Sequence, residues 1–176
     1  QGKSSACSVA EFVQILRQAN MNGANRLFGG HLITWMDEVA AVSARRYAEG
    51  PVTTACIENL RFLRPAHLNE TLVVTGRVIF TGHTSMEVLV TAETEGYDGA
   101  RVLIADAHVI LVALDEEEHP RAVAPLIPVT TNSFINPPFT VLTDTLPLML
   151  PHSVHSLLLL MHPKSSAYAP DRMPQA

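Results

Sequence analysis

The sequence has little of what several large protein classes need. It contains two cysteines, Cys7 and Cys56, among 176 residues, so a disulfide-stabilised secreted scaffold is not indicated. The twelve lysines and arginines are scattered along a chain of formal net charge −5, which makes nucleic acid a poor candidate partner. No apolar run approaches the roughly 20 residues of a transmembrane helix, so we expect no membrane span.

Several chemical signatures are missing as well. The chain has neither the Gly-x-Ser-x-Gly elbow of α/β-hydrolases nor a Gly-rich dinucleotide fingerprint. Its eight histidines and two cysteines show no metal-ligand spacing, so we expect no metal and no cofactor. The N-terminal residues lack a signal-peptide pattern, which predicts a cytoplasmic protein and leaves a mitochondrial location open if an upstream peptide has been removed.

The sequence does contain one long helical pattern followed by four strand patterns. From His31 to Glu49 apolar residues recur at helical intervals without Pro or Gly, and Gly50-Pro51 supplies a stop. The strand patterns, separated by turn-forming residues, are Val52–Leu63, Thr71–Thr81, Thr84–Glu95 and Arg101–Leu114. The segment 9–17 is compatible with either a short strand or a helical turn.

These patterns predict an α+β fold. The helix is apolar around much of its circumference, so we expect it to be buried on most sides. A strongly curved antiparallel meander around it meets that need, and the edge strands of such a sheet invite pairing between two copies. We expect the domain to cover residues 9–128, after an N-terminal extension at 1–8 and before a Pro-rich irregular tail at 129–176.

Asp37 is the most informative residue of the helix, because it stands two turns inside, beside Trp35 and Met36. Aspartate is a poor helix former, and burying its charge without a partner is costly, which favours a chemical role. The alternative is that Asp37 and Glu38 lie on an exposed strip and pair with Arg45, since charged residues are usually solvated.

Three blocks carry a family resemblance. The segment Asn22 to Glu38, NGANRLFGGHLITWMDE, and the blocks Val52–Ala55 and Thr81–Val88 resemble the acyl-CoA hydrolase branch of the hotdog-fold thioesterases. The resemblance covers about Val9 to Pro128. It implies a hotdog fold, with a curved antiparallel sheet wrapped around one long central helix. It also implies hydrolysis of acyl-CoA to fatty acid and coenzyme A, a role in fatty acid metabolism, and homo-oligomers that are dimers or trimers of dimers.

The same resemblance implies a catalytic site built from Asn22 of one subunit and Asp37 of the other. Thioester hydrolysis passes through an oxyanion, and the N–H groups of Gly29 and Gly30 at the positive end of the helix are suitable donors. Asp37 acts as general base or as nucleophile, and Asn22 binds the carbonyl oxygen or orients the water; both choices stay open. Weaker candidates for substrate binding are Thr53, Thr54, Arg61, Arg64, His83, Thr84 and Ser85, each with an ordinary structural alternative.

Two other functions stay open. A hotdog thioester dehydratase needs a histidine and an acid over the acyl chain, and no histidine falls at the matching helix position. A non-catalytic acyl-CoA-binding hotdog protein has little reason to bury a carboxylate. Chain-length preference is not readable from the sequence, although Trp35, Phe62 and Met86 are candidates for lining the acyl tunnel.

The tail 129–176 departs from the family pattern. Family members continue with a charged, helix-forming segment, whereas this tail is apolar, interrupted by prolines and almost free of charge before Lys164. An altered reading frame or splice form is one hypothesis for its origin.

Overall fold

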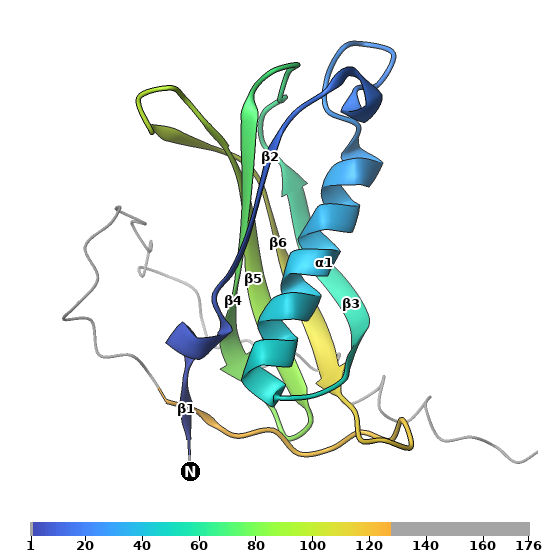
Figure 1. Cartoon of the computed structure of the whole chain (residues 1–176). Helices are drawn as coiled ribbons and strands as arrows, with labels where there is room; N and C mark the ends of the chain where they lie inside the picture. The colour runs from blue at the N-terminus through green and yellow to red at the C-terminus, as the bar shows by residue number, and fades with distance from the viewer. Residues whose placement is uncertain (1, 128–176) are drawn as a thin grey trace, which may run out of the picture. The chain divides into compact units, whose positions relative to one another are not determined.

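A computed structural model describes residues 2–127 of the chain. One helix, α1 (Gly29–Ala48), lies against a five-stranded antiparallel sheet (Figure 1). The strands of this sheet are β2 (Ala10–Ile15), β3 (Val52–Phe62), β4 (Thr71–Thr81), β5 (Ser85–Glu95) and β6 (Arg101–Ala113). The smaller elements are β1 (Lys3–Ser4), the 3-10 helices η1 (Ser5–Ser8) and η2 (Gln18–Asn20), and β7 (Leu126–Ile127), which pairs in parallel with β1. This arrangement is the predicted hotdog fold.

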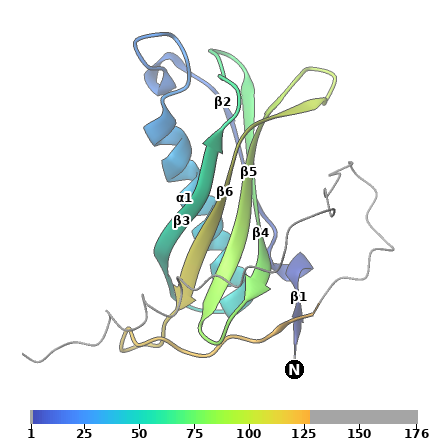
Figure 2. The same ribbon diagram turned by 180° about the vertical axis from the view of Figure 1, so that it is seen from behind.

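The strand order is β2-β4-β5-β6-β3, so only β4, β5 and β6 follow one another as a meander. The predicted four-strand meander is wrong at β3, which pairs with β6 and not with β4. The connection from Phe62 to Thr71 is too long for a tight hairpin. It takes the chain from β3 across β6 and β5 to β4, three strand spacings or about 14 Å at 4.8 Å per spacing. β3 is therefore an edge strand (Figure 2).

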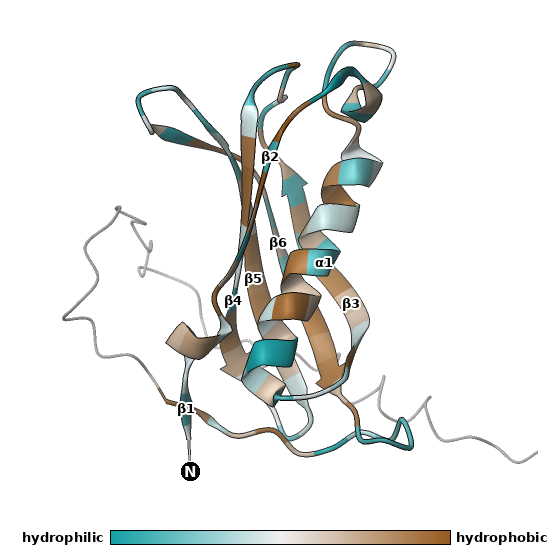
Figure 3. Ribbon diagram, in the orientation of Figure 1, coloured by the Kyte–Doolittle hydropathy of each residue, from teal (hydrophilic) through white to brown (hydrophobic). Residues whose placement is uncertain are grey.

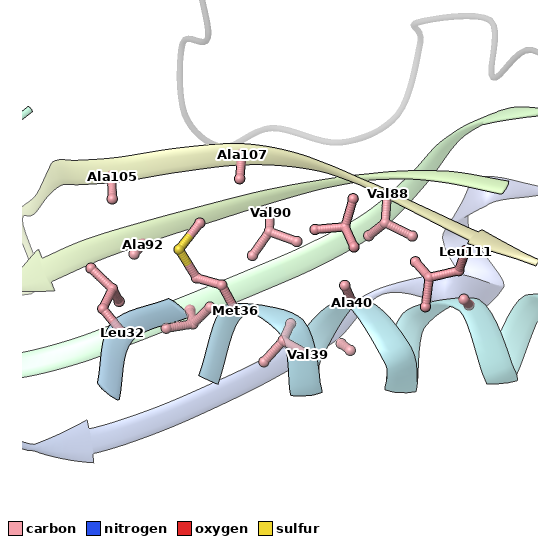
Figure 4. Close-up of a cluster of buried hydrophobic side chains, with 14 of the residues drawn as sticks. Leu32, Met36, Val39, Ala40, Val88, Val90, Ala92, Ala105, Ala107 and Leu111 are labelled. Carbon is pink, nitrogen blue, oxygen red and sulfur yellow. The ribbon is translucent and has the colours of Figure 1, made fainter. Parts of the chain in front are cut away.

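The core lies between the helix and one face of the sheet. Every second residue of β5 points into it, as expected for a strand with one buried face. Figure 3 shows apolar residues concentrated on the helix and along the strands. The buried side chains that meet here include Leu32, Met36, Val39, Ala40, Val88, Val90, Ala92, Ala105, Ala107 and Leu111 (Figure 4). Gly76 on β4 allows close packing, because a Cβ there would lie 2.9 Å from Cγ1 of Val39.

The sheet covers α1 on one face only. The opposite strip, formed by Thr34, Glu38, Val42 and Arg45, is exposed. The expectation of a helix buried on most sides is therefore wrong for the described chain, because its single sheet curves around one face. Asp37 lies on the flank between the two faces and is half-buried.

The N-terminal segment predicted as an extension packs onto the domain. Ser8 is fully buried, and its Oγ accepts a hydrogen bond of 3.0 Å from the backbone N–H of Val78. The segment 9–17, left open between strand and helical turn, contains strand β2. The predicted tail, 129–176, lies outside the described residues. Among residues 2–127, no helix, α1 included, is both long enough and apolar enough to cross a membrane.

Candidate active site

Helix α1 begins without a cap. Phe28 precedes it and supplies no side-chain hydrogen bond, and the first turn has no acidic residue. The N–H groups of His31 and Leu32 donate to the carbonyl of Phe28, whereas those of Gly29 and Gly30 have no acceptor among residues 2–127. These two N–H groups, at the positive end of the helix, are available to an anionic oxygen.

Glycine at position 30 lets the Phe28 ring pack closely against the helix start. A Cβ there would lie 2.5 Å from Cε1 of the Phe28 ring, well inside van der Waals contact. The Phe28 ring also meets His31 edge-on, with ring centroids 5.5 Å apart. The aromatic ring therefore covers one side of the helix start, a contact that no sequence pattern predicted.

Asn22 is oriented by its own loop. Its Oδ1 accepts hydrogen bonds from the backbone N–H groups of Ala24 (2.9 Å) and Arg26 (3.2 Å). Because N–H donors must meet the oxygen of the amide, the NH₂ group is left to donate elsewhere. The NH₂ group can donate to a carbonyl oxygen or to the oxygen of a water, so both roles considered for Asn22 stay open.

Asp37 is held by strand β3. Oγ1 of Thr54 donates a hydrogen bond of 2.8 Å to Oδ1 of Asp37, which leaves Oδ2 free to accept from a water. Among the ion pairs of the described residues none involves Asp37 or Glu38, so the alternative pairing with Arg45 is not observed. Thr53, next to Thr54, is exposed and takes no part in this contact.

A single chain keeps the two catalytic candidates apart. Asn22 and Gly29 line a groove of about 390 Å³ at the start of the helix. Asp37 is not among the groove residues, because it lies eight positions after Gly29, about 12 Å further along the helix axis at 1.5 Å per residue. One chain thus contains both halves of the predicted site without joining them.

Arg61 and Arg64 have different surroundings. Arg61 forms a two-pronged ion pair with Asp106 on β6, through Nε–Oδ1 at 3.0 Å and Nη2–Oδ2 at 2.5 Å. Hydrogen bonding to this carboxylate raises the pKa of Arg61, so the guanidinium is already engaged. Arg64 lines the groove with Asn22 and is the better placed of the two to meet a phosphate.

His83 and Thr84 lie in the β4–β5 turn and Ser85 begins β5, at the end of the sheet away from the start of α1 (Figure 1). The carbonyl oxygens of these residues accept backbone hydrogen bonds from Val123, Ala113 and Gly82, respectively. The structure does not bring this turn together with Asn22 within one chain.

Only one of the three candidates for lining the acyl tunnel lies at the groove. Phe62 is a groove residue, and its ring lies 3.4 Å from the position that a Cβ on Gly29 would take. Met86 is fully buried in the core, where the alternation of β5 could have assigned it. Trp35 stacks on Phe12 at 5.5 Å and on His31 at 5.8 Å.

Asp115, Glu117 and His119 come together in the turn after β6, with potential ligand atoms within 4.8 Å of one another. The sequence spacing did not single out this cluster. Oδ1 of Asp115 accepts backbone N–H bonds from Glu117 (3.0 Å) and His119 (2.8 Å), so turn formation accounts for the arrangement. The expectation that the chain binds no metal stays a prediction.

Comparison with known proteins assigns the fold to a family. The model of the thioesterase superfamily matches residues 24–98. The acyl-CoA thioester hydrolase YciA of Escherichia coli K12 is 33% identical over 108 residues, which are 59% of this chain and 82% of that protein. The chain belongs to the thioesterase superfamily. A second relative in it, the acyl-CoA thioester hydrolase YkhA of Bacillus subtilis, is 34% identical over 110 residues, 62% of this chain and 64% of that protein.

Solved structures of acyl-CoA hydrolases have the same fold. The Staphylococcus aureus enzyme in complex with butyryl coenzyme A and coenzyme A is 29% identical, with a TM-score of 0.71 over 73% of this chain and 79% of that one. Structures of this enzyme include variants with alanine in place of an aspartate, a threonine or an asparagine. A hexameric acyl-CoA thioesterase is 30% identical, with a TM-score of 0.71 over 74% of this chain and 85% of that one.

Proposed function

We propose that the chain hydrolyses acyl-CoA thioesters at sites shared between two copies of itself. The observation that carries the proposal is the hydrogen bond from Thr54 to Asp37, which holds a half-buried carboxylate beside the free edge of the sheet. The residues replaced by alanine in the Staphylococcus aureus enzyme support it, because they lie fifteen and seventeen positions apart in the order Asn, Asp, Thr. Asn22, Asp37 and Thr54 have the same order and spacing.

The chemistry follows from the donors and acceptors. The NH₂ group of Asn22 and the N–H groups of Gly29 and Gly30 bind the carbonyl oxygen as it gains negative charge. Asp37 takes a proton from water, whose oxygen bonds to the carbonyl carbon. The C–S bond then breaks, the sulfur leaves with a proton as the thiol of coenzyme A, and the carboxylic acid remains. Direct attack by Asp37 to form an anhydride is the alternative for the first step.

The assembly that completes the site is antiparallel pairing of two β3 strands. An unpaired edge strand presents free N–H and C=O groups to another copy. Gly29 and Phe62, at one end of β3, line the same groove, and Asp37 accepts a hydrogen bond from Thr54 near the other end. Antiparallel pairing therefore brings the helix start of one copy toward Asp37 of the next. Three such dimers would form the hexamer that two similar thioesterases adopt.

Release of free thiol from acyl-CoA tests the activity. We expect Asp37→Asn to lower kcat by about a hundredfold or more, because the general base is lost. Glu38→Gln is the matched control, since it makes the same acid-to-amide change at the exposed neighbouring position. Protein without substrate serves as the blank, because exposed Cys7 also reacts with thiol reagents. No thiol release from wild type across a panel of acyl chains would contradict the proposal.

Other expectations keep the status of predictions. The proposed reaction uses water and needs no cofactor beyond the coenzyme A that the substrate carries. We also propose a role in fatty acid metabolism and a cytoplasmic location. Binding of acyl-CoA without thiol release would favour the non-catalytic acyl-CoA-binding function instead.

A further inference from the structure

The loop that carries Asn22 lies outside the core. Asn22 and the four residues after it are all exposed. The hydrogen bonds from the N–H groups of Ala24 and Arg26 to Asn22 shape the loop from within, but they do not attach it to the helix or the sheet. A donor stabilises a developing charge best when it is held in place beforehand, because it then needs no reorganisation during the reaction. The position of Asn22 therefore depends on what fastens the ends of its loop.

Asn20 fastens this loop to the start of α1. The chain leaves β2, passes through η2 and the loop, and then enters the helix (Figure 1). The backbone carbonyl of Asn20 accepts a hydrogen bond of 2.9 Å from the N–H of Phe28, the residue before the helix. Just inside this bond, Met21 and Leu27 form an antiparallel bridge. These contacts close the base of the loop and keep Asn22 beside the helix start.

The side chain of Asn20 fastens the loop to the sheet. Its Oδ1 accepts hydrogen bonds from the backbone N–H of Arg17, at 2.9 Å, and from Nε2 of Gln14, at 3.2 Å. Gln14 belongs to β2, where it pairs with the fully buried Leu72 of β4. Asn20 is half-buried, so these bonds are partly shielded from water. One residue thus ties the loop to the helix through its backbone and to the sheet through its amide.

We infer that Asn20 is a positioning residue, which holds the loop so that Asn22 and the N–H groups of Gly29 and Gly30 act on one thioester. The inference rests on the proposed function, which gives these groups a shared substrate. Asn20 touches no substrate atom in this role and acts through Asn22. Both of its side-chain hydrogen bonds within residues 2–127 end on Oδ1, so the role requires an acceptor oxygen and not an amide. Gln14 supports it as the donor from the sheet.

Two substitutions of Asn20 test the need for an acceptor. Asn20→Ala removes both side-chain bonds and should lower kcat for thiol release about 10- to 100-fold, as a misplaced catalytic group does. KM should stay close to that of wild type, because no contact with the coenzyme is lost. Asn20→Asp keeps an acceptor oxygen for both donors, so its kcat should stay within about threefold of wild type. A fall in the free energy of unfolding of Asn20→Ala with wild-type kcat would show a merely structural role and overturn the inference.

The same substitution at Asn22 should give the opposite result. Asn22→Asp keeps the acceptor for Ala24 and Arg26 but loses the NH₂ donor, so kcat should fall about a hundredfold or more. The double variant of Asn20→Ala and Asn22→Ala should lose little more than Asn22→Ala alone, because nothing remains for Asn20 to position. Losses that multiply would show that Asn20 acts apart from Asn22, which would overturn the inference.

Gln14→Ala tests the attachment to the sheet without changing the loop itself. It should lower kcat only about threefold, because the N–H of Arg17 still donates to Asn20. Gln18→Ala is the matched control, since it makes the same change at an exposed position of η2, and wild-type kcat is expected for it. Gln14→Ala also decides the matter if Asn20→Ala does not fold, and wild-type kcat in Gln14→Ala would then overturn the inference.

Amide hydrogen exchange separates the hold on the loop from the reaction. In Asn20→Ala the amides of residues 21–28 should exchange about tenfold faster than in wild type, whereas those of β5 keep their rates and Asn20→Asp matches wild type. This pattern without thiol release from wild type would support the hold on the loop and contradict the hydrolase. Thiol release at equal kcat from wild type and Asn20→Ala would support the hydrolase and overturn the positioning role. Unchanged exchange in Asn20→Ala would overturn it too.

Discussion

Two variants that are each inactive should restore activity when they share an oligomer. In one chain the N–H groups of Gly29 and Gly30 precede Asp37 by about 12 Å along the helix. A water and the carbonyl oxygen of one thioester each need a partner within about 3 Å, so a donor and a base this far apart cannot serve the same carbon. We therefore expect Asn22→Ala and Asp37→Asn to damage opposite halves of one shared site.

The size of the recovery follows from symmetry. Alone, Asp37→Asn should lose a factor of about 100 to 10,000 as a missing general base, and Asn22→Ala about 100 to 1,000 as a missing oxyanion donor. A mixed pair has one site with both wild-type residues and one site with neither. After free exchange of equal amounts half of the pairs are mixed, so about a quarter of the wild-type activity should return.

The assay requires proof that subunits exchange. Differently tagged copies of the two variants are mixed, incubated and purified through both tags in turn, and thiol release is measured on the doubly tagged fraction. That fraction should show close to half of the wild-type activity for each pair. A doubly tagged fraction as inactive as either parent would refute the shared site. Full activity of either single variant would refute the assigned roles.

Three further predictions concern single side chains. Thr54→Val removes the hydrogen bond to Asp37 and should lower kcat about tenfold with little change in KM. Thr54→Ser keeps the hydroxyl and should keep kcat close to that of wild type. Equal losses of kcat in both variants would contradict a positioning role. Ser43 Oγ is buried without a partner among the described residues, so Ser43→Ala should raise the free energy of unfolding by about 1 kcal/mol in urea titrations, and a decrease would count against this reading. Burial and the neighbouring Glu58 raise the pKa of the Cys56 thiol, so less thiolate is present at a given pH. Thiol reagents should modify Cys7 first, and the rate at Cys56 should keep rising with pH beyond the usual cysteine range; the reverse order would contradict this.

The sequence predicted the elements well, because their limits are local. Gly50-Pro51 ends the helix and turn residues end the strands, so α1 and β3 to β6 were placed within two residues. The position of β3 in the sheet was not local information. It depends on the long connection from Phe62 to Thr71, which permits pairing with β6, whose residues lie 43 (Phe62 with Ala105) to 61 (Val52 with Ala113) positions later in the chain.

The sequence predicted some residues of the candidate site, but not the contacts that they make across the sheet. Asp37 stood out as an acid within an apolar helix, and its bond to Thr54 depends on how helix and sheet meet. Arg61 was a candidate for substrate binding because it stands near a strand end and arginine commonly binds phosphates. Asp106 does so across the β3–β6 pair, after a register shift at Asn59, whose φ is 52°. Partners so distant in sequence are set by strand register, which local patterns do not give.

The irregularities of β3 limit how this edge strand can pair with another strand. Its pairing with β6 shifts register between Thr54 and Cys56 and again between Glu58 and Arg61. Bulges bend an edge and discourage uncontrolled pairing, so the regular stretch left for another copy is centred near Ile57. Antiparallel pairing about that centre turns the Phe62 end of one strand toward the Thr54 end of the other. In the proposed dimer, this register would bring the oxyanion donors of one copy toward the carboxylate of its partner.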